Sequence, residues 1–403
     1  MKKIKSKTEN ILKRKPTWEV VKLSDVCEID PSKRELNGIE KNTSVSFGMM
    51  ADLGEHKRSF QPKETKTISE LAKGGYSYFK EEDVLLAKMT PCFENGKSGI
   101  AENLENGIGF GSTEFYVLRS QGKILADWIY HIISSEKFLE EGKHSLVGTT
   151  GRRRLMKQYV ETFEIPLPPL EEQKQIATLF QSIETSIEQV DGQEKNLKAL
   201  QKTLVNGLVS TKPVFGNILN SKNCTPTNMG SIAECDKKYP EREKEVERFV
   251  GLEWIEADNF QLQGFGLVAN GTTFTKRFAK GDVLFGKRRA YLKKVAVANF
   301  DGICSGDILV IRAKANKMLQ GLLPFYLSAE AFINHAVSTS AGSLSPRTKW
   351  KDLETFESAI PDLKTQEKIL DVLQQFDTTI QQLKQQKATL KLLKQKLLNE
   401  ILG

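Results

Sequence analysis

Two forty-residue stretches of the chain, residues 170–209 and 363–402, repeat one pattern of apolar and polar positions without a gap, at an offset of 193. Apolar residues recur at steps of three, four and seven, which places them on one stripe of an α-helix close to a coiled-coil seam. A long helix with a single apolar stripe needs a partner, so we expect the two stretches to pair. The predicted seam residues are Ile176, Phe180, Ile183, Ile187, Val190, Leu197, Leu204, Ile369, Leu373, Phe376, Ile380, Leu383, Leu390 and Leu397. Glu184, Glu188 and Lys195 have the opposite phase, and we expect them to face solvent or a partner protein.

The repeat begins upstream of these helices. The tetrapeptide Glu-Thr-Phe-Glu occurs at 161–164 and again at 354–357, and Pro168 and Gln173 have counterparts at Pro361 and Gln366. A period near half the chain length indicates two copies of a domain followed by a helix. The predicted divisions are a basic lead-in (1–16), a first block (17–167), a central helix (168–211), a second block (212–360) and a C-terminal helix (361–403).

Each block alternates short apolar runs with Gly- and Asn-containing turns, which predicts strands. Each block then ends with a stretch of helical periodicity. The expected strands are 45–47, 83–87 and 114–118 in the first block, and 249–255, 282–285 and 307–311 in the second; the expected helices are 124–139 and 319–337, and residues 211–228 are expected to be a polar connector. The blocks match each other weakly in sequence but in the same order. Two explanations stay open: drift of loops after an old duplication, or two modules that recognise different targets.

Composition limits the class of protein. The 403 residues contain no apolar run long enough for a membrane span, and the basic N-terminus lacks the apolar stretch of a secretory signal. The five scattered cysteines fit a reducing cytoplasm, which is the expected location. A net charge of +8 is compatible with nucleic-acid binding.

Motifs for catalysis are missing from the sequence. Gly96-Lys97-Ser98 resembles the end of a phosphate-binding loop, but Pro91 stands where the first glycine is required. The four histidines are scattered, and the acidic pairs fall where expected strands or helices begin, where solvated or helix-dipole roles are commoner than catalysis. We therefore expect a chain that is not an enzyme and binds no metal or cofactor.

Basic residues cluster instead. The densest run is 287–294, in a Gly-flanked segment, and it favours nucleic acid because Arg and Lys pair with phosphates and guanine edges. An isolated lysine elsewhere is more simply a solvated charge. The candidate DNA-binding residues are Lys88, Thr90, Lys97, Arg152, Arg153, Arg154, Lys276, Arg277, Lys280, Lys287, Arg288, Arg289, Tyr291, Lys293, Lys294 and Arg347.

Several segments together resemble the DNA-specificity subunit of type I restriction–modification enzymes. The resembling segments are residues 249–255 (FVGLEWI), 280–289 (KGDVLFGKRR), 301–310 (DGICSGDILV) and 165–173 (IPLPPLEEQ). The first block departs from the family pattern, because Val45–Asp52 stands where the "VGLE" segment belongs and Lys88-Met89-Thr90 where the basic run belongs.

The resemblance implies an α/β (α+β) fold: two target-recognition domains related by pseudo-two-fold symmetry and separated by two long helices in an antiparallel coiled coil. It also implies a non-catalytic subunit whose domains each read half of a bipartite asymmetric site in double-stranded DNA. Two methyltransferase subunits would dock on the helices and methylate adenine N6 with S-adenosylmethionine. Restriction/translocase subunits, which use ATP and Mg, would complete a host-defence complex. The alternatives are a coiled-coil scaffold whose globular domains bind protein or RNA, and a stand-alone restriction enzyme, which the missing nuclease motifs disfavour.

Overall fold

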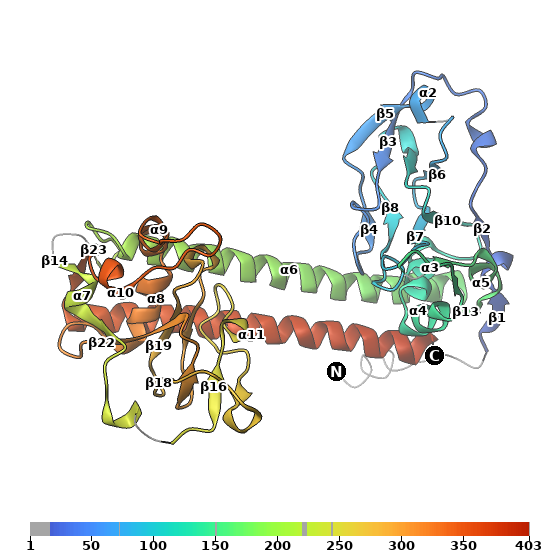
Figure 1. Cartoon of the computed structure of the whole chain (residues 1–403). Helices are drawn as coiled ribbons and strands as arrows, with labels where there is room; N and C mark the ends of the chain where they lie inside the picture. The colour runs from blue at the N-terminus through green and yellow to red at the C-terminus, as the bar shows by residue number, and fades with distance from the viewer. Residues whose placement is uncertain (1–16, 72, 150, 220–223, 243–244, 403) are drawn as a thin grey trace, which may run out of the picture. The chain divides into compact units, whose positions relative to one another are not determined.

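The computed structural model describes residues 17–402 except 72, 150, 220–223, 243 and 244, so the lead-in predicted over residues 1–16 lies outside the described residues. The chain divides into two compact units (Figure 1). Unit 1 comprises residues 1–190 and 386–403, and unit 2 comprises residues 191–385. Each long helix therefore contributes one half to each unit.

Two sheets form the body of unit 1. The central sheet has the order β2-β10-β7-β8-β4, and the second sheet has the order β5-β3-β9-β6. All neighbouring strands are antiparallel except β3 with β9 and β4 with β8, which are parallel. The strands are β2 (Cys27–Ile29), β3 (Ser44–Gly48), β4 (Ser59–Phe60), β5 (Glu64–Thr67), β6 (Ser77–Lys80), β7 (Val84–Ala87), β8 (Ser98–Ala101), β9 (Ile108–Gly111) and β10 (Phe115–Ser120).

Strand β7 is the middle strand of the five-stranded sheet, and all four of its residues are apolar and buried. Val84 and Leu86 join a core with the helices of the unit, whereas Leu85 and Ala87 join a second core with aromatic side chains of both sheets. Successive strand residues point to opposite faces, so a strand covered on both faces must be apolar throughout. Helix α3 (Ala126–Ile133) packs on β7, β8 and β10, and α4 (Glu136–Lys143) and α5 (Lys157–Thr162) follow it along the chain.

Unit 2 has the same plan. Its sheets have the orders β15-β22-β19-β20 and β17-β16-β21-β18, and the pair β16–β21 is parallel like β3–β9. A two-stranded pair precedes the long helix in both units, β1 (Glu19–Lys22) with β13 (Glu164–Leu167) and β14 (Cys224–Asn228) with β23 (Glu357–Pro361). The other strands and short α-helices of unit 2 are β15 (Ala233–Cys235), β16 (Arg248–Val250), β17 (Gly266–Leu267), β18 (Lys276–Phe278), β19 (Val283–Gly286), β20 (Val295–Val297), β21 (Gly302–Cys304), β22 (Ile308–Ala313), α7 (Met229–Ile232), α8 (Leu323–Ser328), α9 (Glu330–Ser338) and α10 (Trp350–Leu353).

Both predicted block-end helices are broken. The first ends at Ile133 and restarts at Glu136, because the Ser135 hydroxyl accepts a hydrogen bond from the Phe138 amide (3.2 Å) and so begins a new helix. The second breaks at Ala329, whose backbone is extended. There the Asn206 side chain accepts the amide of Glu330 (3.0 Å), a contact between distant segments that periodicity cannot reveal.

Two further sequence predictions were wrong in part. Strand β16 ends at Val250 and a short 3-10 helix, Leu252–Trp254, follows it, so 249–255 is not one strand. The connector 211–228 contains β14 and buries Phe215 and Leu219. Its polar composition concealed an edge strand that pairs on one side only.

The long helices are α6 (Leu170–Leu208) and α11 (Leu363–Leu402). A buried glutamine near the start of each long helix fixes that end of the helix. Gln173 accepts the Leu125 amide (2.8 Å) and donates to two carbonyls, and Gln366 does the same with the Leu319 amide (3.0 Å). These contacts satisfy buried backbone groups, which explains why glutamine recurs here.

Within each unit, the half-helices pack with opposite chain directions. In unit 1, Ile176 and Phe180 share a core with Leu397 and Ile401. In unit 2, Val205 and Leu208 share a core with Ile369 and Leu373. Every predicted seam residue is buried or partly buried: Ile176, Phe180, Ile183, Val190, Ile369, Leu373, Ile380 and Leu397 are buried, and Ile187, Leu197, Leu204, Phe376, Leu383 and Leu390 are partly buried.

The apolar stripe is not buried throughout. Leu200 and Leu393, which are repeat counterparts, are 50% and 44% exposed. Glu188 and Lys195 are exposed as expected, but the expectation for Glu184 was wrong. Its carboxylate pairs with the Lys394 ammonium (2.5 Å), so it faces the other helix and not solvent.

Candidate nucleic-acid interface

A hairpin lies beside the end of the central strand in each unit. In unit 1 it is formed by β11 (Leu146–Val147) and β12 (Arg154–Leu155). The Thr90 amide donates to the Arg153 carbonyl (2.9 Å), and the Leu155 amide donates to the Lys88 carbonyl (2.8 Å). These bonds join the hairpin to the three residues that follow β7.

Unit 2 repeats these contacts. The Arg289 amide donates to the Pro346 carbonyl (2.8 Å), and the Thr348 amide donates to the Lys287 carbonyl (3.0 Å). Reciprocal bonds between Ala341 and Arg347 close the hairpin. Residues 88–90 are thus the structural counterparts of 287–289, although Met and Thr replace the two arginines.

An ion pair anchors each hairpin to the strand beside it. Arg347 donates to both carboxylate oxygens of Asp307 (2.7 and 3.1 Å). Arg154 and Glu114, which lie 193 positions before Arg347 and Asp307, make the equivalent pair in unit 1. Arg154 binds both carboxylate oxygens of Glu114 (2.9 and 2.5 Å). The arginine in each case lowers the pKa of its carboxyl partner below the ordinary range.

Some candidates bond within their own unit. The Lys97 ammonium donates to the Met50 carbonyl (3.1 Å), and Lys294 donates to the Leu252 carbonyl (2.6 Å). Both lysines stand just before a sheet strand, β8 or β20, so they tie the preceding loop to the segment after β3 or β16. Thr90 is buried and bonds to the Arg153 backbone. The sequence alone could not distinguish residues that bond within their own unit from residues whose side chains are free in solvent.

Others have a partner and remain accessible. Lys276 donates to Asp236 (2.7 Å) and to a backbone carbonyl, and Arg153 pairs with Glu94 (3.0 Å). Arg288 donates to the Ser345 hydroxyl (2.5 Å), and Lys293 lies 3.8 Å from Glu330. The Lys88 ammonium lies 4.5 Å from the centre of the Tyr116 ring, and its partial burial lowers its pKa.

The remaining candidates differ in exposure. Arg152, Lys280, Arg289 and Tyr291 are exposed, whereas Arg277 and Lys287 are half-buried. Tyr291 lies on a short 3-10 helix, Ala290–Leu292, directly after Arg289. Each hairpin region therefore has an accessible surface. It carries the cationic Arg152 in unit 1, and the cationic Arg289 with the aromatic Tyr291 in unit 2.

Four residues of this region were missed by the sequence reasoning: Glu114, Asp307, Leu344 and Ser345. Glu114 and Asp307 carried a detectable signal, because both are acidic and occupy equivalent positions of the repeat. Leu344 and Ser345 carried none, since the hairpin tips share no sequence.

A buried ionic centre lies at the other end of β19 in unit 2 and of β7 in unit 1. Asp282, which has no exposed side-chain area, binds Arg242 and Arg312 (both 2.8 Å) in unit 2. In unit 1, Asp83 pairs with Arg119 (2.6 Å). Buried charges must be paired, so these centres fix the turn that leads into β7 or β19.

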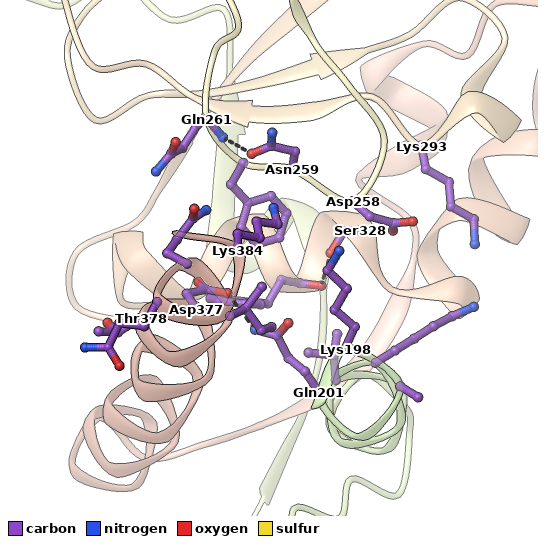
Figure 2. A pocket seen from close by; sticks show the side chains of 18 of the residues that line it. Lys198, Gln201, Asp258, Asn259, Gln261, Lys293, Ser328, Asp377, Thr378 and Lys384 are labelled. Carbon is purple, nitrogen blue, oxygen red and sulfur yellow. Dashed lines mark hydrogen bonds between the residues drawn. The ribbon is translucent and has the colours of Figure 1, made fainter. Parts of the chain in front are cut away.

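A pocket of about 620 Å³ lies elsewhere in unit 2, between α6, α11 and the segment 258–261 (Figure 2). Gln201 donates to Asp377 (2.7 Å) across it. Two of its lysines have partners, since Lys198 pairs with Glu194 and Lys202 pairs with Glu330.

Among residues 17–402, less the omitted positions, no group of three or more His, Cys, Asp or Glu side chains could hold a metal ion. The same residues contain no helix long and apolar enough to cross a lipid bilayer.

Comparison with known proteins identifies the family. The profile of the type I restriction modification DNA specificity domain matches residues 15–199 and 227–392, which is most of the chain. The chain belongs to this family. Its two matches coincide with the two repeats, so each repeat contains one specificity domain.

Curated relatives agree with the assignment. The chain is 31% identical over 196 residues to the EcoAI type I restriction enzyme specificity subunit of Escherichia coli, and 32% identical over 195 residues to the EcoEI specificity subunit of the same organism. Each alignment covers 48% of this chain and 32% of the relative, so the chain matches about a third of the length of these relatives.

Solved structures share the fold. A chain from a structure described as the basis of complex assembly and conformational transition of the type I restriction–modification system superposes with a TM-score of 0.61 at 19% identity. The match covers 96% of this chain and 98% of the other. The two-domain α/β fold with two long helices is therefore that of this family.

Proposed function

We propose that the chain is the DNA sequence-specificity subunit of a type I restriction–modification complex, and that each unit reads one half of a bipartite, asymmetric site in double-stranded DNA. One observation carries the proposal. Both units hold a hairpin against a central strand with equivalent backbone bonds and an equivalent ion pair, yet the exposed side chains differ. A shared scaffold with different side chains suits two domains that read different bases.

The exposed chemistry suits duplex DNA. Arginine can bind a guanine edge with two hydrogen bonds, and lysine or arginine can neutralise phosphates. Arg288 and Arg289 in unit 2 and Arg152 in unit 1 are exposed on the hairpin regions. The relatives above are named specificity subunits, and that name supports the same role here.

Partner subunits would perform the chemistry in this proposal. Two methyltransferase subunits dock on α6 and α11 and methylate adenine N6 with S-adenosylmethionine, and restriction/translocase subunits use ATP and Mg. This chain itself is a non-catalytic subunit that binds no cofactor, and it acts in the cytoplasm. Exposed leucines on the long helices, Leu200, Leu392 and Leu393, support a protein-docking role for these helices.

The alternative function is a coiled-coil scaffold whose globular units bind protein or RNA. The two functions differ in nucleic-acid preference and salt dependence. The specificity subunit with its methyltransferase should bind duplex DNA in preference to single strands and RNA, and its affinity should fall steeply as salt rises. Binding that is insensitive to salt, or that prefers RNA, would support the scaffold.

The decisive experiment is sequencing of methylated adenines in DNA from the host. The proposed function predicts one bipartite motif with an unread spacer, and its loss when this chain is deleted. A control strain in which the deleted chain is supplied from a plasmid should recover the motif. An unchanged set of methylated sites in the deletion strain would contradict the proposal.

A further inference from the structure

Leu344 lies at the tip of the unit 2 hairpin and is 90% exposed, more than any other large apolar side chain in the part of the chain that the structure describes. Single exposed leucines are ordinary on protein surfaces. This one is unusual because its immediate surroundings are rigid and cationic.

The rigidity comes from contacts on both sides of the tip. Arg347 closes the hairpin with Ala341 and binds Asp307 through its side chain. Ser345 accepts a hydrogen bond from Arg288, and the Pro346 carbonyl accepts one from the Arg289 amide. The residues that flank Leu344 are therefore held on the strand end, and the leucine projects from a fixed base.

The charge around the tip favours a polyanion as the occupant. Arg288, Arg289 and Arg347 all belong to the segments that support the hairpin, and all three are exposed. Interfaces with DNA are much more positively charged than interfaces between proteins. A leucine within an arginine cluster thus fits a nucleic-acid groove better than a protein surface.

The equivalent tip in unit 1 differs. Counting back 193 positions from Leu344 and Ser345 gives Gly151 and Arg152, and Arg152 is exposed. The backbone bonds from the hairpin to the strand end and the arginine–carboxylate pair are equivalent in the two units, whereas the side chains at the tip differ. Phosphate contacts carry no sequence information and need no such change, whereas base contacts do.

We propose that Leu344 is a base-contacting residue of unit 2, whose side chain enters the major groove of the second half-site and packs against a thymine methyl group. This inference rests on the proposed function. Apolar side chains read thymine through its C5-methyl, the one apolar group on the floor of the major groove. The arginines at the base of the hairpin bind the flanking phosphates and set the depth of the tip.

The first test is crosslinking in the complex of this chain with its methyltransferase. A photoreactive leucine analogue replaces Leu344, and in a matched control it replaces Leu392, which is 71% exposed on α11. Leu344 should crosslink to DNA within the second half-site, and Leu392 should not. Crosslinks from position 344 to the methyltransferase, or to neither partner, would overturn the proposal.

The second test measures the methyl contact. Leu344→Ala should weaken binding to the specific site about tenfold or more, and Leu344→Met should restore most of it. Replacing the contacted thymine by uracil removes only the methyl and should cost the wild-type complex about fourfold, with no cost to the Leu344→Ala complex. An equal cost of uracil in both complexes would overturn the proposal.

A variant outside the tip separates this inference from the proposed function. Arg288→Ala with Arg289→Ala removes charge from the base of the hairpin and leaves the leucine in place. If this double variant loses duplex binding while Leu344→Ala keeps it, the DNA-reading function holds and the leucine contact is refuted. If neither variant affects duplex binding, the function proposed for this surface fails as well.

Discussion

Arg347 binds both carboxylate oxygens of Asp307 and thereby joins the hairpin of unit 2 to the start of β22. Arg154 and Glu114 make the equivalent pair in unit 1. Both arginines are about half exposed or more, so each pair contributes little to stability. Their consequence is geometric, because each pair fixes the surface that would meet DNA.

Asp307→Asn should reduce sequence discrimination without unfolding the chain. The freed Arg347 can pair with any phosphate while the hairpin loses its anchor, so we expect the ratio of specific to non-specific affinity to fall about tenfold. The measurement is competition binding with and without the target site. Glu114→Gln is the matched variant and should act on the first half-site alone. Unchanged discrimination in both variants would contradict an anchoring role.

The pH dependence of the Asp307 pair follows from the lowered carboxyl pKa. A lowered pKa stabilises the folded state above the ordinary carboxyl range of ~4, and this contribution is lost as the pH falls through the folded-state pKa. Between pH 6 and pH 8 the carboxylate stays ionised, so titration of this pair should cause no change in the sequence discrimination of the wild-type complex.

Replacing Lys287, Arg288 and Arg289 by Ala should weaken DNA binding and leave methyltransferase binding intact, since none of them lies on a long helix. Each lost phosphate contact reduces the salt slope by about one, so the slope should fall by up to about three. Affinity measured over a salt series checks this. Unchanged affinity at moderate salt would show that this run does not touch DNA.

Asp282→Ala should destabilise unit 2 by roughly 3–5 kcal/mol, because it leaves the buried guanidinium of Arg242 without its partner. Urea unfolding monitored by an intrinsic probe of unit 2, such as Trp350, checks the loss. Glu256→Ala removes an exposed carboxylate of the same unit and should change stability by less than about 0.5 kcal/mol. Similar values for the two variants would contradict a structural role for the buried centre.

The sequence predicted the repeated parts of the chain well. The apolar stripe, the Pro-to-Gln helix starts and the central strands rest on local periodicity and on the exact repeat, and they agree with the structure. The breaks at Ser135 and Ala329 in the two block-end helices were not predicted from the sequence. The Ala329 break depends on Asn206, a residue 123 positions away in sequence that lies on another helix.

The candidate interface was harder to predict because charge alone does not reveal a partner. Lys97 and Lys294 belonged to basic segments, yet both donate to backbone carbonyls of their own unit. Asp307 and Leu344 lack positive charge, so a search for basic residues passed over them. Backbone hydrogen bonds between residues 287–289 and 346–348 bring Asp307 and Leu344 close to the basic run, and those bonds are a property of the fold.

His131 should make unit 1 sensitive to acid. It is buried against Phe180 (ring centres 4.5 Å apart), and neither ring nitrogen has a hydrogen-bond partner among the described residues. Burial, and next Lys394 and Arg58, hold its pKa well below the ordinary value. The unfolded chain therefore binds a proton near pH ~6.5 that the folded chain does not, so stability falls as the pH drops below that value.

His131→Phe should remove this loss, which amounts to ~1.4 kcal/mol per pH unit at most. The measurement is urea unfolding at pH 7.5 and pH 5 for the wild type and the variant. His144→Phe, at an exposed position, is the matched control and should keep the acid sensitivity. A His131→Phe variant that loses as much stability in acid as the wild type would contradict the assignment.

Polar contacts cross the long helices at equivalent positions of the two units. In unit 1, Glu184 pairs with Lys394, and in unit 2, Gln201 donates to Asp377. Position 377 is the repeat counterpart of 184, and position 394 is the counterpart of 201. A carboxylate thus recurs in the same place on each helix, opposite a donor that is charged in one unit and neutral in the other.

These contacts predict a reciprocal effect of charge exchange. Both members of the Glu184–Lys394 pair are mostly buried, so Glu184→Lys places two ammonium groups together and Lys394→Glu places two carboxylates together. Each single variant should be less stable than the wild type, and the double exchange should recover stability, with a coupling energy of about 1–3 kcal/mol. Urea unfolding of the four proteins gives this energy. Gln201→Lys adds an ammonium opposite Asp377 and reproduces in unit 2 the pair of unit 1, so it should be tolerated, whereas Gln201→Glu should be destabilising. Additive effects in the unit 1 cycle, or equal stability of the two Gln201 variants, would mean that these polar contacts do not specify how the helices pair.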